Sequence, residues 1–144
     1  MTDKSEKGIL FICIENSSRS QMAEGFAKAL GLNASSAGTF PSSQVNPLVI
    51  QAMMEEGIDI SSYKPKLVTE EMVEKAALAV LTDATLEEAL PKKIRKKMGK
   101  KLVVWSISDP QGQPIEGVRL IRDQIRRQVN ELAEKEKVRK TVSS

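Results

Sequence analysis

The stretch over residues 9–30 most constrains the fold, because its hydrophobic pattern changes in the middle. It reads ILFICIENSSRSQMAEGFAKAL. The continuous apolar run at its start predicts a buried strand. After a short polar loop, apolar residues recur at the spacing of a helix: Met22, Ala23, Phe26, Ala27 and Leu30. A strand, a polar loop and a helix in this order present backbone N–H groups to an anion at the helix N-terminus.

Cys13 is the only cysteine in the sequence, and it falls at the end of the expected strand. The residues that follow can curl around a bound oxyanion with their N–H groups inward, and the planar fork of Arg19 matches a phosphate group. The amides, the helix dipole and Arg19 all favour a thiolate at Cys13. We therefore predict a nucleophilic cysteine within an oxyanion-binding loop formed by Ile14, Glu15, Asn16, Ser17, Ser18, Arg19 and Ser20. The spacing alone leaves open the alternative of a buried, inert cysteine beside an unrelated arginine.

Two residue types limit the chemistry, since the 144-residue chain has no histidine and one cysteine. The lack of histidine removes Cys-His and Ser-His catalysis and the commonest metal ligand, so we expect neither a cofactor nor a metal. A lone cysteine excludes an internal disulfide and suits a reducing cytoplasm. No apolar run is long enough to cross a membrane, and aromatic residues make up only 3%, which argues against base stacking on nucleic acid. We therefore expect a cytoplasmic protein that binds neither membrane nor nucleic acid.

Strand patterns alternate with helix patterns along the chain, which predicts an α/β fold with a parallel sheet and helices on both faces. We expect strands over 7–14, 33–37, 77–81 and 102–107. In such a sheet ligands bind at the carboxyl ends of the strands, where the sequence places Cys13, Asp83 and Asp109. We expect a single domain over 1–144, with loose termini at 1–6 and 134–144.

Capping patterns mark the starts of several helices. Asn46 before Pro47 predicts one start, and Thr85 with Glu88 matches a capping box at another. A long final helix is indicated by apolar residues at helical spacing: Val118, Ile121, Ile125, Val129 and Leu132. The lysines and arginines over 92–101 predict a solvated helix face, with a nucleic-acid or acidic-partner site as the alternative.

Three segments resemble the low-molecular-weight protein tyrosine phosphatase superfamily, which includes the thioredoxin-coupled arsenate reductases. They are FICIENSSRSQMAEGFAKAL, SAGTFPSSQVNPLVIQAMMEEGIDIS and the Asp109-Pro110 pair. The resemblance implies a four-stranded sheet in the order 2-1-3-4 and a phosphocysteine at Cys13. It also implies that Asp109 is the general acid, with Asp83 as the alternative on location and a plain Asp-Pro turn as another. Phe40 would form a wall of the cleft, with simple loop packing as the alternative.

The sequence departs from the family pattern at several positions. The family usually has glycine at the position of Glu15, so a carboxylate here adds negative charge beside the anion site unless it points outward. Phosphatases often carry a second cysteine at the position of Ser18, and an aromatic pair where this chain has Gln111 and Gly112. Thioredoxin-type arsenate reductases carry two more cysteines after the third strand, where this sequence has none. The sequence therefore lacks the residues of the usual aryl pocket and of an internal thiol relay.

A further implication concerns a potassium ion that some arsenate reductases of this superfamily bind beside the loop. The matching positions include Asn16, Glu24 and Ser36, whereas the remaining acidic position corresponds to Lys66. An ammonium in place of a carboxylate weakens a cation site. We therefore expect no metal, and we expect Glu24, Ser36 and Lys66 to support the loop; a solvated Lys66 is the alternative.

Together, Cys13, Arg19 and Asp109 predict a cysteine-dependent phosphomonoesterase of the low-molecular-weight tyrosine phosphatase type. Phosphoryl transfer to Cys13 needs only Arg19 and an acid such as Asp109. Its partner would be a phosphorylated protein or a small aryl phosphate. The main alternative is an arsenate reductase of the same fold that acts on arsenate with an external low-molecular-weight thiol. A catalytically weak binder of phosphorylated partners is the third interpretation.

Overall fold

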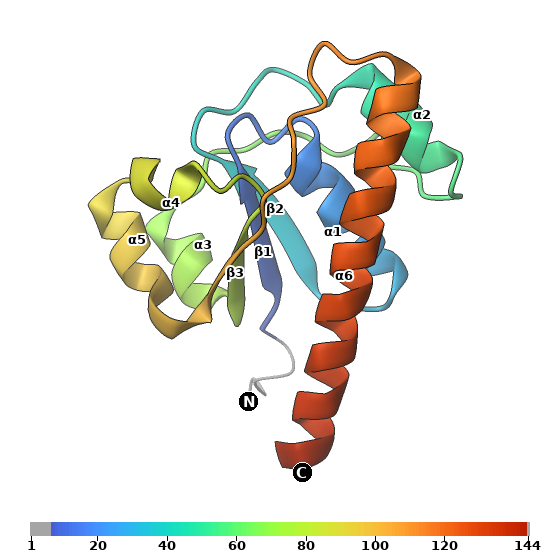
Figure 1. Cartoon of the computed structure of the whole chain (residues 1–144). Coiled ribbons are helices and arrows are strands. Elements are labelled where there is room, and N and C mark those ends of the chain that lie inside the picture. The colour runs from blue at the N-terminus through green and yellow to red at the C-terminus, as the bar shows by residue number, and fades with distance from the viewer. Residues whose placement is uncertain (1–6, 144) are drawn as a thin grey trace.

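Four parallel strands form the centre of the molecule, in the order β2-β1-β3-β4 (Figure 1). They are β1 (Ile9–Cys13), β2 (Ala34–Gly38), β3 (Leu78–Leu81) and β4 (Leu102–Val104). The computed structural model describes residues 7–143, with side chains for 7–137, so the predicted loose segment 1–6 and residue 144 lie outside the described residues. The fold class and strand order predicted from the sequence are confirmed.

Helices cover both faces of this sheet (Figure 1). One face carries α1 (Arg19–Ala29), α2 (Pro47–Met54) and α6 (Ile115–Ser143). The other carries α3 (Glu70–Lys75), α4 (Leu86–Ala89), α5 (Lys92–Met98) and the short 3-10 helix η2 (Gly99–Lys101). The layers follow from the alternation of strands with helices, because each crossover between parallel strands places its helix on one face of the sheet.

Strand β1 contributes side chains to both hydrophobic cores. Ile9 and Phe11 point to the core shared with α1, α2 and α6, while Leu10 and Ile12 point to the core shared with α3, α4 and α5. This is the two-residue alternation of a strand that is buried on both faces. Burying each of these side chains contributes about 1.5–3 kcal/mol, so the strand that carries Cys13 at its end is firmly anchored.

The fourth strand is shorter than the predicted 102–107. Its last ladder bond runs from Trp105 N to the Leu81 oxygen (2.8 Å), and the chain then leaves the sheet. Trp105 itself is buried, with its ring centroid 5.7 Å from that of Phe11. The departure from the ladder has a structural consequence, since it brings the Ile107 carbonyl and Asp109 toward the loop after β1.

The structure confirms one predicted helix start, at Asn46, and contradicts another, at Thr85. The Asn46 side chain accepts a hydrogen bond from Leu48 N, with Pro47 as the first helical residue, as predicted. The capping box at Thr85 is wrong, because the Thr85 hydroxyl bonds Asp83 and not the backbone of α4. The segment expected to be loose from residue 134 on has a helical backbone up to Ser143, where α6 ends. Glutamate, lysine and arginine, which favour helices, make up six of the ten residues over 134–143.

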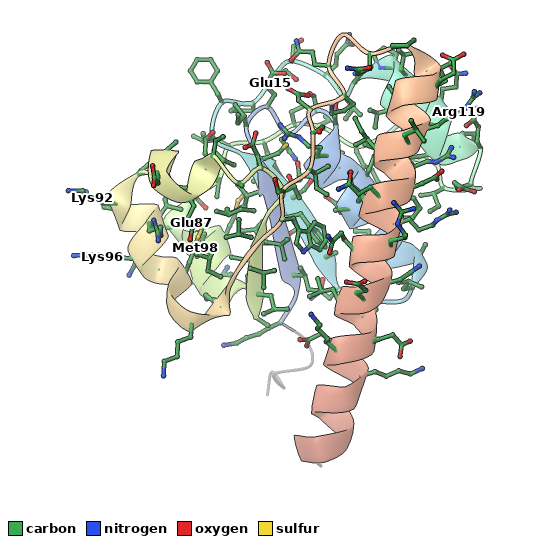
Figure 2. All side chains as sticks on the ribbon, in the orientation of Figure 1. Glu15, Glu87, Lys92, Lys96, Met98 and Arg119 are labelled. Carbon is green, nitrogen blue, oxygen red and sulfur yellow. The ribbon has the colours of Figure 1, made fainter. Side chains whose placement is uncertain are left out.

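The basic segment 92–101 forms an exposed face of α5 and η2. Lys92 and Lys96 point away from the body of the molecule (Figure 2). Lys97 pairs with Glu74, and Lys101 Nζ donates to carbonyl groups at the end of α3. These contacts agree with the solvated helix face predicted from the sequence. None of the described helices combines the length and the apolar composition needed to cross a membrane.

Candidate active site

The loop after β1 lies at the carboxyl edge of the sheet, where Asn16 adopts the left-handed backbone (φ 53°). Asparagine tolerates this conformation better than most side chains. Gln21 Nε2 donates to the backbone oxygen of Asn16 (2.9 Å), and Lys66 N donates to its side-chain oxygen (3.0 Å). The turn is thus fixed from both sides by buried or partly buried hydrogen bonds.

Cys13 is buried at the base of this loop. Asn16 N donates to Cys13 Sγ at 3.2 Å, and Ser20 Oγ lies 2.8 Å from the sulfur. Ser20 Oγ also accepts a hydrogen bond from Asn16 Nδ2 (2.7 Å), which leaves its own proton available for the sulfur. Two donors therefore face Cys13 Sγ, and donors of this kind stabilise a thiolate.

The segment after β2 shapes the loop from outside. Thr39 N, Phe40 N and Ser42 N donate to the backbone oxygens of Cys13, Ile14 and Glu15 at 3.2, 2.7 and 3.0 Å. These bonds turn the loop carbonyls away from the pocket and leave the N–H groups for an oxyanion. Gly38 permits the close approach, because a Cβ there would lie 2.5 Å from the Ile14 oxygen and 2.9 Å from Asn16 N.

Arg19 opens α1 and is almost completely buried. Its Nη1 donates to the Ile107 oxygen (2.8 Å) and lies 3.0 Å from Asp83 Oδ2. Its Nη2 lies 3.9 Å from Asp109 Oδ2. The guanidinium is thus held by residues that follow β3 and β4, and Arg19 lines the same cavity as Cys13.

The two aspartates beside Arg19 differ in environment. The Asp83 side chain is 14% exposed, and the Asp109 side chain is 52% exposed. Burial alone would raise the pKa of Asp83, but hydrogen bonds from Thr85 and the charge of Arg19 outweigh burial and hold that pKa below its usual value. Asp83 is therefore an ionised partner of Arg19 at neutral pH. Asp109 Oδ1 accepts a hydrogen bond from Gln111 N (3.0 Å), Oδ2 is the oxygen 3.9 Å from Arg19 Nη2, and the residue lines the pocket.

These elements enclose a cavity of about 140 Å³. Its lining consists of Cys13, Ile14, Glu15, Ser17, Ser18, Arg19, Asp109 and Gln111. Most of the predicted loop residues therefore face one space, while Asn16 and Ser20 lie beneath the loop and hold Cys13. Phe40 is not in this lining, and it is 79% exposed. Phe40 thus neither walls this cavity nor packs into the loop, because only its backbone N–H anchors it there.

The predicted support residues form two separate contacts. Glu24 is buried and accepts a hydrogen bond from Ser36 Oγ (2.6 Å), and its second oxygen pairs with Lys28 Nζ (2.7 Å). Lys66 contacts the loop through its backbone N–H, while the residue itself is exposed. The positive charge beside Glu24 therefore comes from Lys28.

These residues do not fit a potassium site. Both oxygens of Glu24 have partners, and one partner is an ammonium that would repel a cation. The hydrogen bond that Lys28 donates to Glu24 raises the pKa of Lys28, so this lysine stays charged at neutral pH. Within the described part of the chain, no group of three or more His, Cys, Asp or Glu side chains gathers to hold a metal.

Sequence reasoning missed three contributors to the site. Gln21 is fully buried next to Ser20, and its amide holds the Asn16 turn. Its position gave no signal in the sequence, because Gln21 lies away from the apolar face that the predicted helix forms with Met22, Phe26 and Leu30. Lys28 stands four residues after Glu24 in the same helix, a spacing that favours an ion pair. The carbonyl of Ile107 had no sequence signal, because it depends on where β4 ends.

The fold and the site together define an α/β protein that presents a buried cysteine, an arginine and an aspartate around an oxyanion loop at the carboxyl edge of its sheet. The chain belongs to the low molecular weight phosphotyrosine protein phosphatase family, whose sequence profile matches residues 8–144. This is a family of enzymes, and the recognition made from the sequence is confirmed.

Proteins similar to this chain are named for two different activities, arsenate reduction and arginine dephosphorylation. The arsenate reductase of Staphylococcus aureus (strain Newman) is 38% identical over 128 residues, which are 85% of this chain and 92% of that protein. The YwlE arginine phosphatase from Geobacillus stearothermophilus superposes with a TM-score of 0.88 at 23% identity, covering 96% of this chain and 97% of that one. A YwlE arginine phosphatase mutant with a phosphorylated active-site serine has a TM-score of 0.81 at 25% identity, covering 90% and 95% of the two chains.

Proposed function

We propose that this protein is a cysteine-dependent phosphomonoesterase that acts through a phosphocysteine intermediate. One observation carries the proposal: Cys13, Arg19 and Asp109 line the same small cavity, each in surroundings that suit its part in phosphoryl transfer. The sulfur has two hydrogen-bond donors, the guanidinium is fixed by Asp83, and the Asp109 carboxyl is exposed toward solvent.

In the first step, Cys13 Sγ attacks the phosphorus of a bound phosphate ester. The loop N–H groups and Arg19 neutralise the charge on the phosphoryl oxygens, and they are held in place before the reaction begins. The bond from phosphorus to the ester oxygen breaks, and protonated Asp109 supplies a proton to the leaving oxygen. The product is a phosphocysteine at residue 13.

In the second step, water attacks the phosphocysteine. Asp109, now a carboxylate, accepts a proton from this water, so one side chain serves as acid and then as base. The bond between phosphorus and sulfur breaks, inorganic phosphate leaves, and Cys13 returns as a thiolate. Ser20 and Asn16 N stabilise this thiolate as a leaving group.

Two further considerations support the proposal. The phosphorylated active-site serine of the similar arginine phosphatase mutant is a covalent phosphoryl adduct on an active-site side chain. In addition, the cycle closes with one thiol, which is all that this sequence contains. The proposed substrates are phosphorylated proteins or small aryl phosphates, and the proposed compartment is the cytoplasm, where the Cys13 thiol stays reduced.

Arsenate reduction with an external thiol is the second candidate, and the 38% identity to an arsenate reductase favours it. Reduction of arsenate to arsenite takes two electrons, which two thiols supply as they join in a disulfide. Cys13 can provide one of these thiols. The other must then come from a small thiol outside the protein.

A side-by-side assay separates the candidates. We expect the reduced protein to release phosphate from an aryl phosphate without any thiol as co-substrate, and we expect Cys13→Ser to lose this turnover. Thioredoxin as the sole reductant should not sustain arsenate reduction. Robust reduction with thioredoxin alone would promote arsenate reduction to the main function, and phosphate binding without any turnover would make the protein a binder.

A further inference from the structure

Most of the positive charge over 92–101 has no counter-charge. Three of its seven cations have partners, namely Arg95, Lys97 and Lys101. The other four are exposed, and none has an ion-pair or hydrogen-bond partner among residues 7–137: Lys92, Lys93, Lys96 and Lys100. The three of these that belong to α5 form the lysine face, defined as Lys92, Lys93 and Lys96.

The lysine face lies opposite the buried side of its helix. At about 100° per residue, its three members fall within one arc, and the buried Ile94 and Met98 fall on the far side of α5. Lys92 and Lys96 point away from the body of the molecule (Figure 2). The face therefore presents three ammonium groups in one direction.

These lysines oppose the folding of the helix that carries them. α5 begins at Lys92 after Pro91, no side chain caps its N-terminus, and its first turn holds no acidic residue. Cations near a helix N-terminus are repelled by the positive end of the helix dipole, and Lys92 and Lys96 repel each other as like charges four residues apart. The helix is held instead by Ile94 and Met98 in the core. Stability therefore does not account for the lysine face.

The chemistry of the lysine face favours carboxylates over nucleic acid or membrane. Sites for nucleic acid use the planar fork of arginine and aromatic rings, whereas lysine is a hydrated point charge. Arg95, the one arginine of α5, pairs with Glu87, and residues 84–104 contain no aromatic side chain. The large apolar side chains of α5 are buried, so none is available to enter a membrane. An acidic polypeptide segment complements the face.

The catalytic cavity is too small to recognise the protein around a phosphoryl group. Its volume of about 140 Å³ is well below the roughly 300–1,000 Å³ of pockets that enclose drug-sized ligands. The chain passes from Asp83, which pairs with Arg19, through α4 to Lys92. Figure 1 shows α4 toward the end of the sheet where the loop after β1 lies, with α5 continuing along the same flank. A protein bound at the cavity can therefore extend onto α5.

We propose that the lysine face docks an acidic segment of the phosphorylated protein whose phosphoryl group enters the cavity. This inference rests on the phosphatase function proposed above and names a feature of its substrate. Holding the substrate at two places raises the effective concentration of its phosphoryl group at Cys13. The ammonium groups touch no reacting atom, so docking lowers KM and leaves kcat unchanged.

The test compares two phosphotyrosine peptides that share a flexible glycine-serine spacer and end in a run of glutamates or an equally long run of glutamines. The face variant is Lys92→Glu with Lys96→Glu. The control variant is Arg127→Glu with Lys135→Glu, which makes the same change in net charge at exposed positions of α6. All three proteins should turn over a small aryl phosphate equally well.

At low ionic strength, we expect the unmodified and control proteins to show a KM about 3- to 10-fold lower for the glutamate peptide, since several exposed ion pairs act together. The face variant should not distinguish the two peptides. Added salt should remove the advantage, because it screens exposed charges. A spacer too short to reach α5 should remove it as well.

Equal KM values for the two peptides with the unmodified protein, or the same loss of discrimination in the control variant, would overturn the docking site while the phosphatase function stood. If neither peptide is hydrolysed, the phosphatase proposal fails, and fluorescence anisotropy of a labelled glutamate run without phosphotyrosine decides the role of the lysine face. Binding that only the face variant loses would support an acidic-segment site, and equal or absent binding would refute it. A single-stranded oligonucleotide that displaces the glutamate run at a lower concentration would refute a protein partner.

Discussion

Arg19 Nη1 lies 3.0 Å from Asp83 Oδ2, and the two side chains are only 5% and 14% exposed. Asp83 therefore orients the guanidinium, and it has no place in the lining of the cavity. We expect Asp83→Asn to lower kcat/KM by roughly 10- to 100-fold, the size of effect that a misplaced binding group produces. Because Asp83 acts through Arg19, the loss should be the same for good and poor leaving groups across a series of aryl phosphates.

Asp109→Asn should behave differently, because Asp109 is proposed to protonate the leaving group. We expect turnover of phenyl and alkyl phosphates to fall by roughly 100- to 10,000-fold. Esters whose leaving groups are strongly acidic need little help from an acid, so their cysteine phosphorylation should be affected less. A larger loss that depends on the leaving group in Asp83→Asn would exchange the roles of the two aspartates.

Gly38, the last residue of β2, lies against the loop after β1. An added Cβ would lie 2.5 Å from the Ile14 oxygen, a backbone atom that cannot move without displacing the loop. Gly38→Ala should cost about 1–3 kcal/mol in the free energy of unfolding and should weaken phosphate binding. Gly117→Ala is the control, because the three atoms nearest to its added Cβ all belong to the exposed Gln113 side chain and alanine favours a helix. Equal stability of the two variants by denaturant unfolding would contradict this account of the loop.

Lys28 rather than an ion supplies the charge beside Glu24. Replacing potassium by sodium at constant ionic strength should therefore leave kcat/KM and Tm of the unmodified protein unchanged. Lys28→Ala should lower the free energy of unfolding by about 1 kcal/mol, since Glu24 is buried but Lys28 is half exposed. Lys92→Ala, on the exposed face of α5, should have no such effect. A stabilisation specific to potassium in the unmodified protein would show that an ion binds despite Lys28.

Local patterns predicted the parts of the site that depend on neighbouring residues. The switch from a strand pattern to a helix pattern placed Cys13 and Arg19 correctly around one loop, and the family resemblance supplied the strand order. Contacts that join distant segments had no such local signal. The side chain beside Glu24 is that of Lys28 and not Lys66, and the exposure of Phe40 follows from packing that no local pattern encodes. Asp83 was placed correctly at the edge of the sheet, but only its burial beside Arg19 separates its role from that of Asp109.

The central claim is that Cys13 carries the phosphoryl group during turnover, and it can be tested by rapid-quench mass spectrometry. The measurement is best made on Asp109→Asn with an aryl phosphate that has a strongly acidic leaving group, because this variant forms the adduct without an acid but hydrolyses it slowly. We predict a burst of phenol equal to the enzyme present and one phosphoryl group on Cys13. Turnover with no adduct on Cys13, or a Cys13→Ser variant that keeps more than about a thousandth of the original rate, would contradict the mechanism.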